Sequence, residues 1–444
     1  MAASLFESAI FRDLALDREV AALFTDSAEV RAMMIVEGVL AKVQGELGVI
    51  PELSAKAIHR ASLELQIDPA GLAASTAKNA VPIPGLVAHF RELMQAPEHA
   101  QWIHYGATSQ DIMDTALALR LRQAIALYET RLVSILTKLG QLAEDHAETP
   151  MVGRTYGQAA TPTSFGCLVA SWGRPLISLH EQLKALKPHV LRVSLGGAAG
   201  TLSAMGPKGE DVRAALATGL GLGDPGASWH AERNGVAELA AWMTQVTAQL
   251  AKMGDDLTLL TQTGIGEVIL AGAGGSSTMP QKQNPVIPSL LVALSRGMIG
   301  LNATMQFAPV HRLQRDGAAW ISEWMTLPQM CLTAGRALSA ADDLAASISP
   351  NADAMLAGID DGTGLIFAEA LSFRLIEVMP RPDAQAKVKE LCQSVIQNGG
   401  SLRQLAQEGW PDLNLADCFD PRQILGTAAK DARSFKVSTT LLAN

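Results

Sequence analysis

The sequence predicts an all-α protein built around a bundle of long helices, with smaller helical domains before and after the bundle. Two observations predict this fold class. Apolar residues recur in steps of three and four over unusually long segments, and the alternation of β-branched and polar residues that is typical of strands is almost absent. Helices of this length cannot fold back on themselves, so about five of them are expected to pack side by side.

Residues 1–110 are expected to form an N-terminal helical domain. Proline and glycine interrupt them at 48–51 and 81–85, which breaks the pattern into short helices. Residues 111–349 are expected to form the central bundle, and residues 350–444 a small C-terminal helical domain, because the periods shorten again after Pro350.

Five helices are expected within the central bundle. The first and third are indicated by apolar stripes, and the second has a possible kink at Pro175. The expected helices are Asp111 to about His146, Thr163 to His189, a helix that includes Met243–Leu260, Pro285 to about Phe307, and Ala318 to about Ile348.

Composition excludes several classes of function. The net charge of −9 and the absence of a Lys/Arg cluster argue against nucleic acid as a partner. Neither a signal peptide nor a run of 18 apolar residues stands out, so a cytoplasmic protein that does not span a membrane is expected. The four cysteines form no CxxC pair and the nine histidines no HxH or HxxxH pair, so no metal site or cofactor is expected. With 48% hydrophobic and only 18% charged residues, part of the apolar surface is expected to be covered in a homo-oligomer.

The segment 271–285 is the most unusual part of the chain. It places small residues and two serines between two expected helices, and prolines prevent either helix from running through it. Such a loop exposes backbone N–H groups, which suits the binding of an anion. A flexible connector without function is the alternative, and Lys282 and Asn284 disfavour it.

Residues 275–285 resemble the GSSxMPxKxNP signature of the fumarase/aspartase superfamily without a gap. The resemblance implies that Ser276 is the general base and that Lys282 and Asn284 bind a substrate carboxylate. Ser277 and Met279 are expected to contact substrate as well. Removal of a proton α to a carboxylate creates an aci-carboxylate dianion, which fixed donors such as Lys282 would stabilise.

Residues 104–111 are similar to the family's HxGxTSxD segment, in which Thr108 and Ser109 bind a substrate carboxylate. The same two residues could instead cap the following helix, with Asp111 favouring its positive end. Both interpretations can hold together, because a helix N-terminus is itself an anion site. His104 is a candidate catalytic residue, with a hydrogen-bonded structural histidine as the alternative.

Residues 153–158 parallel the family's GRTHxQ segment, with Tyr156 in place of the histidine. In the amine-releasing lyases of the family, that histidine belongs to the acid machinery at the leaving nitrogen. A phenol is a far weaker acid at neutral pH. Tyr156 therefore indicates a leaving group, such as a carboxylate, that needs no proton. Tyr156 is itself a candidate catalytic residue, and Arg154 and Gln158 are expected to contact substrate.

Three further segments, 21–28, 229–233 and 318–324, resemble the bacterial 3-carboxy-cis,cis-muconate cycloisomerases, which act in protocatechuate breakdown. This resemblance implies a small tricarboxylate substrate and a homotetramer whose active sites are shared between subunits. Three carboxylates call for further cationic contacts, for which Arg154, Arg233 and Arg315 are candidates. Each of these arginines has a salt bridge between helices as its alternative, and His230 is expected to contact substrate.

Two other functions stay open. One is a lyase of adenylosuccinate or a similar amino-dicarboxylate, which Tyr156 disfavours. The other is a catalytically silent structural member of the superfamily, which the intact signature disfavours. Two departures from the family pattern leave the proton donor open: no histidine follows Gln158 in the run Gln158-Ala159-Ala160, and Asn234 stands in place of an aspartate.

Overall fold

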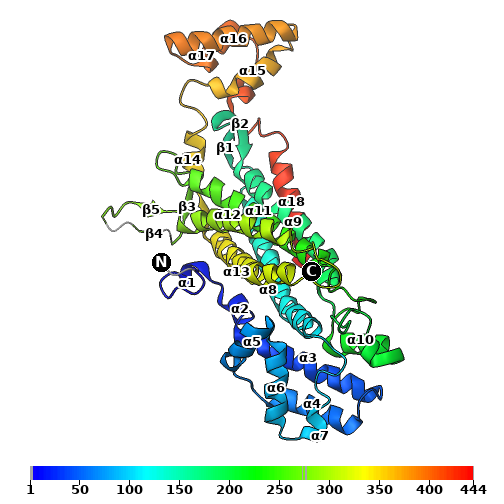
Figure 1. Cartoon of the computed structure of the whole chain (residues 1–444). Helices are drawn as coiled ribbons and strands as arrows, with labels where there is room; N and C mark the ends of the chain where they lie inside the picture. Colours follow the sequence, from blue (N-terminus) through cyan, green and yellow to red (C-terminus); the bar gives the residue numbers. More distant parts are fainter. Residues whose placement is uncertain (1–3, 273, 276–277, 444) are drawn as a thin grey trace. The chain divides into compact units, whose positions relative to one another are not determined.

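The computed structural model describes residues 4–272, 274–275 and 278–443 of the chain. Helices dominate these residues, and the strands are short and paired only two by two within the described part (Figure 1). The predicted all-α class with a core of long helices is confirmed.

The five expected long helices are all present, with ends close to the predicted ones. The helix that begins at the HxGxTSxD segment is the longest, and α9 runs unbroken past Pro175. The five helices are α8 Ser109–Asp145, α9 Phe165–Val190, α11 Asn234–Leu260, α12 Val286–Met305 and α13 Gly317–Ser347.

Contacts between residues divide the chain into two compact units. Unit 1 contains residues 1–130, 179–247 and 294–339, and unit 2 contains residues 131–178, 248–293 and 340–444. Each long helix contributes residues to both units. The three-domain division at residues 110 and 350 stays a prediction.

Unit 1 has a large apolar core to which α3 contributes many residues. At the start of α3 the Thr25 side chain caps the helix by accepting from the Ala28 backbone N–H. Met33 and Leu40 of α3, Phe90 of α6 and Leu216 of α10 are all almost completely buried in this core. The shorter helices of unit 1 are α1 Arg12–Ala15, α2 Arg18–Ala22, α3 Asp26–Glu46, α4 Glu52–Glu64, η1 Pro69–Leu72, α5 Ala73–Asn79, α6 Ile83–Met94, α7 Pro97–Ala100, η2 Ser203–Lys208 and α10 Gly209–Leu220.

Unit 2 has a separate apolar core formed by its C-terminal helices, with Phe367, Leu371 and Leu402 buried in it. The short helices of unit 2 are α14 Ala352–Ala357, η3 Leu365–Phe367, α15 Ala368–Leu375, α16 Arg381–Asn398, α17 Leu402–Gly409, η4 Ala416–Phe419 and α18 Ala428–Ala443. Its strands are β1 Pro150–Thr155, β2 Gln158–Ser164, β3 Val268–Leu270, β4 Gly274–Gly275, β5 Gln283–Asn284 and β6 Ile348–Pro350.

The strands β1 and β2 form an antiparallel hairpin that periodicity did not predict. Thr155 pairs with Gln158, so Tyr156 and Gly157 form a two-residue turn. Their φ angles of 53° and 74° are those of a type I′ turn, whose twist matches that of the flanking strands. Glycine adopts this conformation readily at the second position, whereas Tyr156 adopts it against the preference of its side chain.

Among the described residues, α12 is the one helix long and apolar enough to cross a membrane by length and composition alone. Helices in the cores of soluble proteins share these properties. Only 28% of its apolar window is buried within the chain, so much of this helix is left uncovered.

Gly235→Ala is expected to destabilise unit 1 by about 1–3 kcal/mol, because the added Cβ would lie 2.3 Å from the backbone oxygen of His189. Relief of this clash requires a shift of the helix backbone, which costs more free energy than a change of side-chain rotamer. Urea unfolding followed by circular dichroism measures the loss. Gly409→Ala in α17 is the control, since among the described residues nothing lies within 4 Å of its added Cβ. Equal stability of the two variants would contradict the close packing of α11 on α9.

Candidate active site

The N-terminus of α8 is the centre of the candidate site in unit 1. The Thr108 backbone N–H donates to Asp111 Oδ2 at 2.9 Å, and the side chain of the third helical residue accepts in the same way in a capping box. The Asp111 carboxylate thus caps the start of α8, while capping by the Thr108 and Ser109 side chains stays a prediction. Thr108 and Ser109 remain half-buried beside the first turn, where backbone N–H groups favour an anion.

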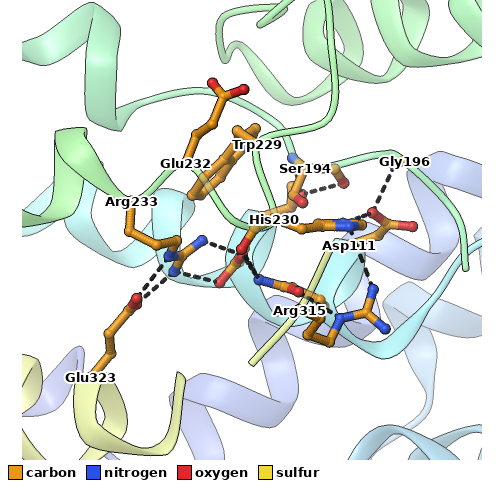
Figure 2. A network of polar contacts seen from close by, with 12 residues as sticks. Asp111, Ser194, Gly196, Trp229, His230, Glu232, Arg233, Arg315 and Glu323 are labelled. Atoms are coloured by element: carbon orange, nitrogen blue, oxygen red, sulfur yellow. Dashed lines mark hydrogen bonds and ion pairs between the residues drawn. The ribbon is translucent and has the colours of Figure 1, made fainter. Parts of the chain in front are cut away.

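Asp111 joins three separate segments of unit 1 through one completely buried carboxylate. It accepts from the backbone N–H groups of Gly196 at 2.8 Å and Gly197 at 2.9 Å, and from His230 Nε2 at 2.7 Å (Figure 2). A Cβ on Gly196 would come within 2.6 Å of Ser228 Oγ, so a larger residue would push this loop away from Asp111.

His230 is held on both ring nitrogens. Its Nε2 donates to Asp111, which can only accept, and its Nδ1 lies 3.4 Å from Arg315 Nη2, which can only donate. Both contacts fit the tautomer with the proton on Nε2. Arg315 also donates through Nε to Gln110 Oε1 at 2.7 Å, so the arginine side chain links the histidine to the first turn of α8.

Arg233 is completely buried between two carboxylates. It donates to both oxygens of Asp114, with Nη1 at 2.7 Å from Oδ2, and to both oxygens of Glu323, with Nη2 at 2.6 Å from Oε2 (Figure 2). Its guanidinium carbon also lies 4.6 Å from the centre of the Trp229 ring. Burial disfavours its charge, but the two carboxylates more than offset this and raise the pKa of Arg233. The structure thus presents the salt-bridge alternative for this residue.

His104 lies at the edge of the same region and pairs with an acid from α3. Its Nδ1 is 2.7 Å from Glu37 Oε1, and the Glu37 side chain is 1% exposed. Its φ of 64° is left-handed, a conformation that costs free energy in any residue other than glycine and tends to occur at functional sites.

Arg154 in unit 2 forms a bidentate pair with Glu267, at 2.9 and 2.7 Å. Glu267 is buried, whereas 33% of the Arg154 side chain remains exposed, so one face of the guanidinium can still meet a ligand. Tyr156 and Gln158 lie on the exposed end of the same hairpin, and Tyr156 is fully exposed.

The signature segment also lies in unit 2, on a second hairpin. Gly274 pairs with Asn284 and Gly275 with Gln283, so the described residues 278–282 lie between two strands. Lys282 and Met279 are exposed there, and Asn284 is half-buried. Ser276 and Ser277 lie outside the described residues.

Sequence reasoning assigned no role to the acids that hold these residues in place, Glu37, Asp114, Glu267 and Glu323. One signal could have found Asp114. Asp111 and Asp114 lie three residues apart among the apolar residues Ile112, Met113 and Ala116, and a charge buried among such residues needs a partner. Within the part of the chain that the structure describes, no group of three or more His, Cys, Asp or Glu side chains is placed to hold a metal.

Similarity to known proteins shows the family to which this chain belongs. The lyase family matches residues 17–300, so the chain belongs to it, and the predicted membership is confirmed. A 3-carboxy-cis,cis-muconate cycloisomerase of Pseudomonas aeruginosa is 36% identical over 92% of this chain and 91% of its own. The solved 3-carboxy-cis,cis-muconate lactonizing enzyme of Pseudomonas putida has a TM-score of 0.93 and 32% identity, covering 98% of this chain and 100% of its own. A nitrosuccinate lyase of Streptomyces davaonensis is 32% identical over 96% of this chain and 94% of its own.

Arg233→Met is expected to lower the free energy of unfolding by about 3–5 kcal/mol, because it leaves Asp114 and Glu323 buried without a counter-charge. Urea denaturation at neutral pH measures the effect. The matched control is Arg18→Met, whose partner Asp13 lies in an exposed pair 3.2 Å away and whose loss should cost under about 1 kcal/mol. Similar losses in the two variants would show that the buried triad is not a main support of unit 1.

Proposed function

We propose that this chain is a 3-carboxy-cis,cis-muconate cycloisomerase, which closes its substrate to 4-carboxymuconolactone in the β-ketoadipate pathway of protocatechuate breakdown. The observation that carries the proposal is the nearly full-length similarity to enzymes of that name and to the solved lactonizing enzyme. The unbroken signature at residues 275–285 supports it, because the reaction needs a base and a cradle for an anion.

In this reaction one terminal carboxylate attacks the carbon that bears the extra carboxyl group. A proton is added beside the other terminal carboxylate. The reverse reaction is a β-elimination through an aci-carboxylate, in which Ser276 takes the proton as general base. Because the leaving group is a carboxylate, no general acid is needed to protonate it. The presence of Tyr156 in place of a histidine agrees with this.

The donors that would bind the three substrate carboxylates come from several segments. Thr108 and Ser109 offer one anion site at the start of α8, with His104 next to it. The signature segment supplies a second through Lys282 and Asn284, supported by contacts from Ser277 and Met279. We assign further substrate contacts to the partly exposed Arg154, to Arg315 and to Gln158. Arg233 and His230 instead hold the site together, because their polar atoms are engaged within the chain.

We further propose that the protein acts in the cytoplasm as a homotetramer whose active sites are shared between subunits. Apolar side chains exposed on α12, α13 and the segment between them would be covered by further copies of this chain. They are Ile299, Phe307, Val310, Leu313, Ile321 and Met325. The exposed position of Tyr156 and Gln158 fits a site that is completed by another subunit.

A lyase that releases an unsaturated dicarboxylate is the second candidate. The similarity to the nitrosuccinate lyase favours it, since that name indicates cleavage of a substituted succinate. A catalytically silent family member is a third, and the intact Lys282 and Asn284 of the signature argue against it.

Ser276→Ala is expected to lower turnover at least about 10²-fold, because a positioned base contributes about that much or more. The measurement is the loss of ultraviolet absorbance of 3-carboxy-cis,cis-muconate on addition of purified, EDTA-treated protein. Ser434→Ala, an exposed serine of α18, is the control and should keep full activity. An inert wild-type protein that instead releases fumarate from adenylosuccinate, or nitrite from nitrosuccinate, would move it to the lyase candidate, and a fully active Ser276→Ala variant would remove the serine base.

Ile299→Glu is expected to split the tetramer into smaller species, because it places a charge on the exposed apolar face of α12. Light scattering after gel filtration gives the mass. Ile396→Glu on α16 changes an isoleucine that is more exposed than Ile299 and lies outside that face, and it should leave the mass unchanged. A wild-type monomer at micromolar concentration would argue against the assembly.

A further inference from the structure

Two polar residues of α3 hold the turn that carries His104. Glu37 Oε1 contacts His104 Nδ1 at 2.7 Å, and Gln44 Nε2 donates to the Tyr105 backbone oxygen at 2.7 Å. Glu37 and Gln44 are seven residues apart, so they lie on one face of the helix, and both are buried in an apolar environment. This face of α3 therefore fixes both the backbone of the turn and the orientation of the imidazole.

The carboxylate of Glu37 depends on this single contact. Its second oxygen, Oε2, is buried and has no hydrogen-bond partner among the described residues. A buried carboxylate without a counter-charge is costly, so the imidazolium form of His104 is the form that Glu37 stabilises. An arrangement this unfavourable to stability is typical of a site kept for its chemistry.

The other edge of the ring is open. Within the described part of the chain His104 Nε2 has no hydrogen-bond partner. This atom is not fully buried, and 19% of the His104 side chain is exposed. Nε2 can therefore meet a ligand while Nδ1 stays on Glu37. Thr108 follows four residues later at the start of α8, where an anion is already favoured.

We propose that Glu37 is the positioning residue of the active site: it orients His104 through Nδ1 and supplies the counter-charge with which His104 binds a substrate carboxylate through Nε2–H. The inference rests on the proposed function for the identity of the substrate. The contact between Glu37 and His104 does not depend on that identity.

The charged groups that act on His104 agree with this role. Burial disfavours the imidazolium, but the charge and the hydrogen bond of Glu37 and the charge of Asp111 on α8 outweigh burial, so the pKa of His104 is raised. Arg91 on α6 acts in the opposite direction. His104 thus keeps its charge to a higher pH than an ordinary histidine, and it loses that charge, and with it the attraction for a carboxylate, as the pH rises through the raised pKa.

Glu37→Gln tests the proposal, because the amide keeps a hydrogen bond to Nδ1 and removes the charge. The alkaline limb of the kcat/KM profile is expected to move about one unit toward lower pH. At a pH above the shifted limb, KM should rise about tenfold while kcat changes much less, since the anchor holds substrate and transition state alike. Glu37→Asp, which keeps the charge, should recover part of the affinity.

Nuclear magnetic resonance of histidine-labelled protein supplies a readout that needs no substrate. The His104 signal, identified by its loss in His104→Gln, should titrate above the ordinary value of about 6.5 in the wild-type protein and lower in Glu37→Gln. The control is Ser54→Ala, which removes the partner of another histidine, His99, at 3.0 Å from its Nδ1, and should leave the activity profile unchanged.

A wild-type His104 that titrates at or below the ordinary value would overturn the proposal, even if Glu37→Gln did not fold. So would a Glu37→Gln profile that coincides with the wild-type profile. If the wild-type protein leaves the muconate intact, the substrate assignment fails, and the histidine titration still decides the role of Glu37.

Discussion

The carboxylate of Asp111 is the interaction on which the organisation of unit 1 depends. From the described residues it accepts four donors, which belong to the start of α8, to the 196–197 loop and to His230. A buried carboxylate is stable only when such donors satisfy it. Because all four converge on one residue, the N-terminal end of α8, the loop beside it and the histidine keep a common geometry.

From Asp111 the polar contacts continue to His230 and Arg315 (Figure 2). From Arg315 they continue through Gln110 to Asp114 and Arg233. Each member donates or accepts in a direction that fixes its neighbour. Such a network is stabilising only when it is complete, so it specifies one arrangement of the elements rather than several. We infer that residues which look like substrate ligands by type, such as Arg233, serve this network.

The long helices could be predicted from the sequence because their apolar periodicity is local and repeats over many turns, as in α8 and α11. The hairpin at Tyr156 could not, because its stability comes from a left-handed turn and from pairing, which a pattern of apolar residues does not report. The site was predictable as a set of segments that resemble family motifs. The partners of their charges were not, because Arg233 is separated from Asp114 by 119 residues and from Glu323 by 90, and Arg154 from Glu267 by 113.

The buried triad of Asp114, Arg233 and Glu323 also bears on how this sequence can change over generations. Replacing Arg233 alone leaves two buried carboxylates without a counter-charge, and replacing either acid leaves buried guanidinium N–H groups without an acceptor, whereas replacing all three by apolar residues of similar volume can be neutral or favourable. Between the two states lie only destabilised single and double variants. We therefore expect descendants of this protein to keep the triad, because every stepwise route to the apolar alternative passes through a destabilised variant. This holds whether or not the charges of the triad contribute to the reaction.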